Sequence, residues 1–331
     1  MHFFVTGHTG FKGAWLISLL KAKGHKVSGY SLPPAAGGLF AEASMKDDLE
    51  NHTIGDVRDL ALLRLSLNRA MPDVVIHLAA QPLVRRSYED PMDTYSTNVQ
   101  GTLNLLQVVT ELNYSLVTLV ITTDKVYRDS GELHYSEGDP LGGHDAYSAS
   151  KAMADILTQS WAATHPELKL HVARAGNVIG AFDVSTDRLI PDVNRALVLR
   201  EPIRVRNPES VRPWQHVLDC LNGYLEFIDA SFRGAELPIA LNFGPESSET
   251  RSVSEVLRVA KNFEATLKVQ TVTQRGLKET SMLTLDSSEA RRILGWKDKI
   301  KFEEAVRMSL YTSIENARTH SERVTAAFLK S

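Results

Sequence analysis

Tyr147 and Lys151 are the residues of this chain whose types and spacing best suit proton transfer. Side chains four positions apart lie on one face of a helix. A nearby ammonium group lowers the pKa of a phenol, so that Tyr147 can take a proton from a hydroxyl group. Thr123, at the end of a predicted strand, is placed to hydrogen-bond the same hydroxyl. A Tyr and Lys at this spacing are also typical of a solvated helix face, so the interpretation depends on the residues around them.

A glycine loop near the N-terminus supplies a partner for that chemistry. The apolar strand 3–5 runs into Gly7-His8-Thr9-Gly10-Phe11-Lys12-Gly13, and apolar residues then recur at helical spacing. A tight turn between a strand and a helix N-terminus binds a pyrophosphate through free backbone N–H groups. We therefore predict that these seven residues contact a dinucleotide, with His8 close to its phosphates. An ordinary turn is the alternative.

Polar or small residues follow three further predicted strand ends. Asp56 comes after Ile54-Gly55, Ala79-Ala80-Gln81 after Leu78, and Thr122-Thr123-Asp124-Lys125 after Ile121. Ligands of an open parallel sheet bind outside the carboxyl ends of its strands, so these clusters and the glycine loop indicate one crevice. Each cluster alone is equally typical of the start of a loop.

The alternation of elements predicts an α/β fold, a Rossmann-type doubly wound parallel sheet with helices on both faces. Asp59, then Asp93 or Thr94, and finally Asp145 are the expected N-caps of the second, third and fourth helices. Strand patterns fall at 3–5, 27–30, 74–78, 116–122 and 170–174, and helix patterns at 12–23, 59–70, 94–113 and 146–164.

A change of texture after residue 174 predicts two domains. Later segments are shorter and rich in Arg and Pro, so we expect a dinucleotide-binding domain over 1–174 and a smaller α/β substrate-binding domain over 175–331. A helix at 214–228 and a strand at 240–243 are expected to return to the first domain. A last helix is expected from Phe302 to about the end.

Composition excludes several classes of function. With 43% hydrophobic and 23% charged residues, the 331-residue chain is typical of soluble globular proteins. A net charge of −3 gives no reason to expect nucleic acid or an acidic membrane surface as a partner. The single cysteine, Cys220, suits a cytoplasmic protein, and its apolar surroundings indicate a packed thiol. We expect neither a signal peptide, nor a membrane span, nor a metal site.

The motifs together resemble a known superfamily. The glycine loop, Leu78-Ala79-Ala80, Thr123, Tyr147 and Lys151 are similar to those of the extended short-chain dehydrogenases/reductases, the NAD-dependent epimerases and dehydratases. Longer stretches resemble the CDP-glucose 4,6-dehydratases, namely 6–13, 29–32, 80–85, 123–127, 174–180, 187–192 and 212–217. Besides Tyr147, Lys151 and the strand-end residues, the resemblance implies that NAD contacts Ser31, Val57, Leu78, Asn98 and Ala175.

The resemblance also implies a reaction, the conversion of CDP-glucose to CDP-4-keto-6-deoxyglucose. Tyr147 would take the proton of the sugar 4-hydroxyl while hydride leaves C4 for NAD. The ketone acidifies the C5 proton, so that a base can remove it as water leaves C6 with Asp124 as the acid, and hydride returns to C6. Lys125 stands where many relatives have a Glu as that base, and can serve only with a partly neutral amine. Alternatively, Lys125 only contacts the cofactor or a carboxylate.

The substrate implied is a nucleoside diphosphate sugar, whose charge suits planar Arg side chains. Arg206 alternates with apolar residues, so a solvated strand face is its alternative interpretation. The expected substrate contacts are Leu83, Arg86, Asn177, Arg188, Leu189, Val205, Arg206, Arg212 and Glu279.

Several departures from the family pattern leave the nucleotide and the sugar open. The run Ser31-Leu32-Pro33-Pro34 lacks the acidic residue that usually contacts the adenosine ribose, so NAD is inferred from its recycling in the reaction. The segments 128–139 and 181–184 and Lys278 also differ. A 4-epimerase, a dehydratase of a dTDP- or GDP-linked sugar, and a non-catalytic dinucleotide-binding regulator are the alternatives.

Two predicted helices, 94–113 and 146–164, carry apolar residues on more than one face. Relatives pair these helices across a twofold axis, so we expect a homodimer, with a tetramer as the alternative. The apolar residues include Leu103, Leu106, Val109, Ile156, Leu157 and Trp161.

Overall fold

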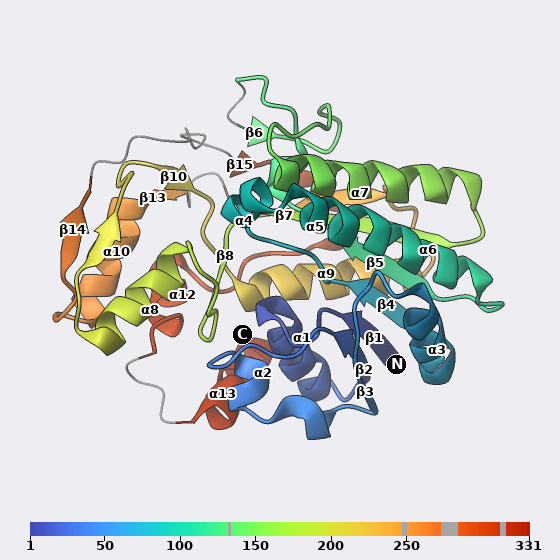
Figure 1. Cartoon of the computed structure of the whole chain (residues 1–331), viewed down its shortest axis with the longest axis horizontal. Coiled ribbons are helices and arrows are strands. Elements are labelled where there is room, and N and C mark those ends of the chain that lie inside the picture. The colour runs from blue at the N-terminus through green and yellow to red at the C-terminus, as the bar shows by residue number, and fades with distance from the viewer. Residues whose placement is uncertain (132–133, 247–249, 273–283, 312–315) are drawn as a thin grey trace.

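A parallel sheet of seven strands forms the centre of the computed structural model, which describes residues 1–131, 134–246, 250–272, 284–311 and 316–331 (Figure 1). The strand order is β12-β7-β5-β4-β1-β2-β3, and all neighbouring strands are parallel. This order confirms the predicted Rossmann-type α/β fold. The strands are β1 (His2–Thr6), β2 (Lys26–Ser31), β3 (Asn51–Ile54), β4 (Val74–His77), β5 (Val117–Ile121), β7 (Lys169–Ala175) and β12 (Ala240–Phe243).

The edge strand β3 lies outside the strand ranges that the apolar pattern predicts. It has a neighbour on one side only, and its side chains are half-buried or exposed. A strand in this position needs no apolar run, so periodicity alone does not reveal it. The predicted bounds of the other strands differ from the observed ones by no more than one residue at either end.

Helices cover both faces of the sheet (Figure 1). Along β1, Phe3 and Val5 belong to a buried cluster with α1 and α9, whereas Phe4 belongs to a second cluster with α3 and α6. This alternation is the two-residue period of a strand and shows that both faces are covered. The helices are α1 (Phe11–Ala22), α3 (Leu60–Ala70), α6 (Gly101–Glu111), α7 (Ala146–Thr164) and α9 (Val217–Phe232).

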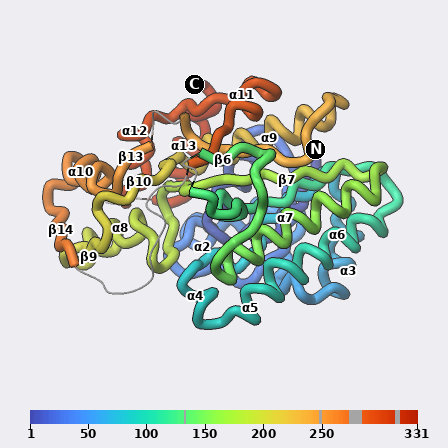
Figure 2. Tube along the Cα trace, turned by 90° about the horizontal axis from the view of Figure 1, so that it is seen from above, coloured from blue at the N-terminus to red at the C-terminus, as the bar shows by residue number. Residues whose placement is uncertain are grey.

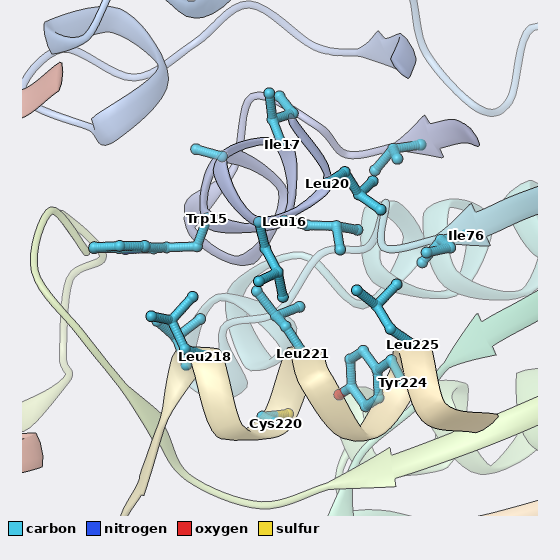
Figure 3. Close-up of a cluster of buried hydrophobic side chains, with 14 of the residues drawn as sticks. Trp15, Leu16, Ile17, Leu20, Ile76, Leu218, Cys220, Leu221, Tyr224 and Leu225 are labelled. Carbon is cyan, nitrogen blue, oxygen red and sulfur yellow. The ribbon is translucent and has the colours of Figure 1, made fainter. Parts of the chain in front are cut away.

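The first cluster holds α1 against α9 (Figure 3). Trp15 and Leu16 of α1 face Leu218 and Leu221 of α9 across this interface. Cys220 is fully buried there, which confirms the prediction of a packed thiol.

The predicted helix 94–113 has three consecutive parts, α5 (Pro91–Tyr95), a π-helical turn (Ser96–Gln100) and α6. The predicted cap is wrong, because Asp90 rather than Asp93 or Thr94 accepts the capping hydrogen bond. Proline at the first helical position explains the early start. A π-helical turn widens a helix locally, and such turns are frequent at functional sites.

Two other predicted caps are confirmed. The side chain of Asp59 accepts from the backbone N–H of Leu62, and that of Asp145 accepts from the backbone N–H of Ser148. The second of these fixes the first turn of α7.

Seen from above, α3, α6 and α7 lie side by side on one face of the sheet (Figure 2).

The chain beyond β7 builds a separate buried cluster beside the sheet, in which α8, β9, α10 and α12 pack together (Figure 1). Besides α9, the helices beyond β7 are α8 (Leu189–Leu199), α10 (Val253–Phe263), α11 (Ser288–Leu294), α12 (Phe302–Met308) and α13 (Ala317–Lys330), and α2 (Leu39–Glu42) and α4 (Val84–Glu89) precede them. Of these, α11 and α13 pack instead with the cluster of α1 and α9. Short strand pairs are β6 (His134–Tyr135) with β15 (Thr284–Leu285), β8 (Val178–Ile179) with β11 (Gln215–His216), β9 (Ile203–Val205) with β14 (Val269–Thr271), and β10 (Val211–Arg212) with β13 (Arg251–Ser252).

Two helix predictions in this part need correction. The helix predicted over 214–228 begins at Val217, because Gln215 and His216 pair with β8. The single last helix is wrong, since α12 ends at Met308 and α13 begins at Ala317. Between them, Tyr311 is tied to the side chain of Asn194 through its backbone N–H, which directs the chain away from the helix axis.

Candidate active site

The glycine loop after β1 lies against the loop after β4, where the strand order reverses. Gly7 has a φ of +72°, and a Cβ at this position would lie 2.7 Å from the backbone nitrogen of Ala79. A Cβ on Gly13 would overlap the carbonyl oxygen of Gly7. Both positions therefore require glycine, the first for the turn and the second for close packing of α1. Such a switch point is where open α/β sheets bind nucleotides.

The N-terminus of α1 offers free backbone N–H groups at this loop. Its N-cap is Gly10, which has no side chain to satisfy them, and its first turn carries no acidic residue. These groups fit a pyrophosphate. The imidazole of His8, however, lies against Gly29 of β2, with its Nε2 2.8 Å from Nδ1 of His52. His8 is thus left to approach a phosphate through its backbone only.

The ends of β2 and β3 carry paired polar groups in place of a free acidic residue. The hydroxyl oxygens of Thr9 and Ser31 are 2.8 Å apart. The carboxylate of Asp56 binds the guanidinium of Arg58, with 2.6 Å between Oδ2 and Nη2, and this hydrogen bonding lowers its pKa. Val57, the next predicted contact, is buried.

A buried amide network fixes the loop after β4. Asn98, in the π-helical turn, accepts from the backbone N–H of Gln81 at 2.8 Å and donates to Oγ of Ser150 on α7 at 2.9 Å. The side-chain amide of Gln81 donates to Thr94 at 2.8 Å. These two predicted cofactor contacts therefore hold the loop, while Leu78 and Ala79 lie against the glycine loop, followed by Ala80.

Tyr147 and Lys151 lie buried in the first two turns of α7. Nζ of Lys151 donates to the carbonyl oxygen of Ile121 at 2.6 Å, which places it at the end of β5. The predicted lowering of the Tyr147 pKa is wrong for the protein alone. Burial raises this pKa, and the hydrogen bond with Thr123 offsets only part of the effect. Burial, with the charge of Lys12, lowers the pKa of Lys151 to about 8.

The carboxyl group of Asp124 is buried with one oxygen unpartnered. Its Oδ1 accepts from the hydroxyl of Thr123 at 2.8 Å and from Nζ of Lys125 at 3.4 Å. Its Oδ2 faces Gly176, where a Cβ would approach it to 3.3 Å. A buried acceptor without a partner is costly, so this oxygen is well suited to meet a hydroxyl of a ligand.

Electrostatic contacts join these groups into one site. Thr123, Lys125 and Arg188 all lower the pKa of Tyr147, so the three predicted residues lie near its phenol. Nζ of Lys12 lies 3.1 Å from the hydroxyl of Tyr224 on α9 and acts on Lys151. Sequence reasoning missed Tyr224, because nothing distinguishes one tyrosine in an apolar helix pattern.

Arginine side chains gather on the substrate side of the site. Nη1 of Arg85 lies 2.9 Å from Oδ1 of Asp187, and Nη2 of Arg206 lies 3.4 Å from the same oxygen. Arg188 pairs with Asp183 at 3.5 Å. Arg86, the predicted contact, pairs instead with Asp93 on α5. Its neighbour Arg85 belongs to the stretch 80–85 that resembles the family, but it was not among the predicted substrate contacts.

The remaining predicted substrate residues have mixed surroundings. The side chain of Val205 is buried in the cluster of α8, α10 and α12, and Leu189 packs against the same cluster. Asn177 is half-buried, and its carbonyl oxygen accepts from the backbone N–H of Gln215. Leu83 precedes α4 and Arg212 lies in β10, and both are half-buried. Glu279 and Lys278 lie outside the described residues.

Two further properties concern metals and membranes. Among the described residues, no group of three His, Cys, Asp or Glu side chains could hold a metal ion. No helix in the described part of the chain is long and apolar enough to cross a membrane.

The comparison with known families decides the relationship. The family model described as GDP-mannose 4,6 dehydratase matches residues 4–309. The chain belongs to the GDP-mannose 4,6-dehydratase family. This finding confirms the predicted kinship with the nucleotide-sugar epimerases and dehydratases. Within this family, the site unites a glycine loop, a buried Tyr and Lys, and an acid beside an amine.

Curated relatives of this dehydratase family member share most of its length. A CDP-glucose 4,6-dehydratase of Salmonella typhimurium is 40% identical over 306 residues, which cover 88% of this chain and 85% of the relative. A dTDP-glucose 4,6-dehydratase of Xanthomonas campestris is 27% identical, and the match covers 92% of this chain and 91% of the relative. The predicted class, a nucleotide-sugar 4,6-dehydratase, is thereby confirmed.

Solved structures share the fold of this family member. A UDP-glucose 4-epimerase from Bifidobacterium longum, in complex with NAD⁺ and UDP, has a TM-score of 0.83 at 22% identity, covering 96% of this chain and 99% of that one. A dTDP-glucose 4,6-dehydratase from Bacillus anthracis, in complex with NAD, has a TM-score of 0.78 at 22% identity, covering 93% and 95%. At these identities the likeness concerns the fold alone.

Proposed function

We propose that the protein is an NAD-dependent hydro-lyase that converts CDP-glucose to CDP-4-keto-6-deoxyglucose. The observation that carries the proposal is the unpartnered carboxylate oxygen of Asp124, which lies beside Lys125 and near Tyr147. An epimerase needs a phenol but neither an acid at C6 nor a base at C5. The 40% identity to a protein named CDP-glucose 4,6-dehydratase supports the choice of nucleotide.

Tyr147 takes the proton of the sugar 4-hydroxyl in the first half of the reaction. Its hydrogen bond with Thr123 and the charges of Lys125 and Arg188 favour the phenolate against burial. Thr123 orients the hydroxyl. When bound, NAD would supply the redox chemistry, as the acceptor of the C4 hydride and then the donor of the hydride to C6.

Asp124 and Lys125 carry the elimination. The C4 ketone acidifies the proton at C5, and the amine of Lys125 removes it. Asp124 protonates the hydroxyl that leaves C6, so that the two groups together release one water. Thr123 donates to Oδ1 of Asp124 and leaves Oδ2 without a partner, so that this oxygen is available to the leaving hydroxyl.

The cofactor is held at the switch point of the sheet. The backbone N–H groups of α1 would bind its pyrophosphate, and Gly7, Gly10 and Gly13 would let the chain approach it closely. Thr9, Ser31 and Asp56 would hold the adenosine ribose. Lys151, in the second turn of α7, and Ala175, at the end of β7, would hold the nicotinamide.

The nucleotide part of the substrate binds among the arginines. Arg188, Arg206 and Arg85 surround Asp187 and Asp183, and a diphosphate replaces these carboxylates as their partner. Arg212, Asn177, Leu83 and Leu189 complete this side.

We also propose a division of the chain into two domains, a dimer and a location in the cell. Residues 1–174 with α9 and β12 form the cofactor domain, and the rest of 175–331 forms the substrate domain. Two copies pair through α6 and α7, because Met153 and Ile156 of α7 expose apolar side chains. The single cysteine supports a cytoplasmic location.

A panel of substrates tests the activity. The purified protein is incubated with NAD and, separately, with CDP-, dTDP-, GDP- and UDP-glucose. We expect CDP-glucose to lose the mass of one water and to form a 4-ketone, detected by its absorbance in base. An isomer of unchanged mass indicates an epimerase. Dehydration of another sugar nucleotide shows that the substrate carries a nucleobase other than cytosine. No reaction with any of the sugar nucleotides supports a regulator. Light scattering at micromolar concentration tests the dimer, which a monomer alone contradicts.

A further inference from the structure

The segment that carries the proposed acid and base is held at both ends by one buried ion pair. Thr123, Asp124 and Lys125 follow Thr122 directly, and Val126 separates them from Tyr127. Thr122 and Tyr127 each hydrogen-bond to a member of the same pair, Asp155 on α7 and Arg174 on β7. No sequence pattern distinguishes Asp155, and Arg174 stands out only as the first residue of the stretch 174–180 that resembles the family.

The ion pair has the geometry of a planar fork. Nε of Arg174 donates to Oδ2 of Asp155 at 2.8 Å, and Nη2 donates to Oδ1 at 2.9 Å. Their side chains are 2% and 0% exposed. Two parallel hydrogen bonds fix the guanidinium plane, so the remaining donor of Arg174 has a set direction.

At the first end of the segment, Oγ1 of Thr122 donates to Oδ2 of Asp155 at 3.0 Å. Asp155 lies one helical turn after Lys151, whose ammonium group holds the carbonyl oxygen of Ile121. Two successive residues at the end of β5 are therefore fixed to α7. The helix that carries Tyr147 thus sets the point from which the acid and base depart.

At the second end, Nη1 of Arg174 donates to the hydroxyl of Tyr127 at 2.9 Å, and its guanidinium lies 5.1 Å from the centre of that ring. The same hydroxyl donates to Oδ1 of Asn242 on β12 at 2.6 Å. Nη1 also donates to the carbonyl oxygen of Glu137 at 3.2 Å. The turn that carries Asp124 is therefore anchored to β7 and β12 as well.

A buried ion pair of this kind is weak evidence for a role in stability. Replacing such a pair by apolar residues of similar volume is often neutral or stabilising, because removing both charges also removes their desolvation cost. Its use here is geometric. The pair ties three elements, α7, β5 and β7, to one orientation at the point where the acid, the base and the phenol must meet.

We propose that Asp155 and Arg174 are positioning residues for the elimination half of the reaction. The inference rests on the proposed roles of Asp124 and Lys125. Loss of the fork lets the turn 123–126 shift relative to α7, so that the acid and base miss C6 and C5. Tyr147 and Lys151 stay in place, since their position depends on α7 itself. Oxidation loses only the contribution of Thr123, which moves with the turn.

The main test variant is Arg174→Lys, because one ammonium group keeps the charge but cannot serve both Asp155 and Tyr127. We expect water release from CDP-glucose to fall about 100-fold, the loss typical of a misplacement near 1 Å. Oxidation at C4 stays within a few-fold, so reduced cofactor accumulates during one turnover, as seen in its near-ultraviolet absorbance. Asp155→Asn gives the same pattern.

Controls separate positioning from general damage. Arg291→Lys alters another partly buried ion pair, to Asp298 at 2.7 Å, and should leave the ratio of oxidation to elimination unchanged. If the single variants unfold, the apolar pair Asp155→Leu with Arg174→Met restores the fold and still loses elimination. Equal loss of both half-reactions in a folded variant, or normal elimination in the apolar double variant, overturns the proposal.

A readout that does not depend on the activity separates this proposal from the proposed function. Amide hydrogen exchange of the peptide 122–127 should become faster in Arg174→Lys, with the exchange of 146–155 unchanged. Unchanged exchange at 122–127 overturns the positioning role, whatever the enzyme does. If the wild-type protein eliminates no water from any sugar nucleotide, the proposed function fails, and the exchange result still decides whether the fork holds the turn.

Discussion

The two sides of the site differ in how their charged groups are held. On the cofactor side, Tyr147, Lys151 and Asp124 are at most 9% exposed and are fixed by α7 and the strand ends. On the substrate side, the side chains of Arg85 and Arg206 are 37% and 36% exposed and share one aspartate. Surface ion pairs contribute little to stability and exchange partners readily. Buried charged groups keep their partners. The difference teaches that the groups proposed for the chemistry are preset, while the proposed recognition of the diphosphate requires the arginines to exchange ion-pair partners.

The largest effect is expected from the buried side. Tyr147→Phe removes the group proposed to take the 4-hydroxyl proton, so oxidation of the sugar should fall by about 10³-fold. Single-turnover reduction of NAD measures this step. Thermal unfolding should remain close to that of the wild type, because the ring still fills its site. Oxidation at the normal rate would mean that the phenol does no chemistry.

The next effect falls on the elimination. Lys125→Ala should slow water release by about 10²-fold and affect oxidation less, since an amine that acts as a base contributes this much. Lys125→Arg keeps the charge but cannot be deprotonated, so it should resemble the alanine variant. Mass spectrometry of the product measures both. Intact elimination in Lys125→Ala would show that another group is the base.

Some features of the active site follow from the local sequence, and others do not. The spacing of Tyr147 and Lys151 reveals a shared helix face, and the glycine loop reveals the switch point, because both follow from local geometry. The direction of the Tyr147 pKa shift did not follow. It depends on burial, which is set by residues from distant parts of the chain.

Neighbouring residues show the same limit. Arg85 and Arg86 are adjacent residues of the same type, so the sequence does not distinguish them. Only Arg85 pairs with Asp187, because successive residues of α4 point in different directions around the helix. Only the end of β3, before Asp56, was predicted, and its extent was not, because an exposed edge needs no apolar run. Asp155 and Arg174 lie on separate elements, so their pairing becomes visible only in the folded chain.

A smaller effect is expected on the exposed side. Arg206→Ala should raise KM for CDP-glucose about tenfold with little change in kcat, the loss of one charge-assisted hydrogen bond. Arg204→Ala, the exposed neighbour on β9, is the matched control and should leave KM unchanged. A lower kcat with an unchanged KM in Arg206→Ala would contradict the comparison, since the residue would then act on the chemistry.

The smallest effect concerns stability against pH. Burial lowers the pKa of Lys151 from 10.5 to about 8, so between these pH values the unfolded chain binds more protons than the folded one. The wild type should therefore gain stability as pH rises above 8, by less than about 1.4 kcal/mol per pH unit. Lys151→Met should lack this gain in denaturant titrations at pH 7 to 9.5. Parallel curves for the two proteins would show that Lys151 is not desolvated.

The late position of α9 in the chain has a consequence for biosynthesis. When a ribosome has completed β7, six of the seven strands exist, but the helix that covers Leu119 and Ile121 has not been made. The nascent chain therefore displays an apolar sheet face until residue 232 has emerged. A chaperone that binds apolar segments is expected to bind this exposed sheet face. A chain truncated after residue 175 is expected to aggregate.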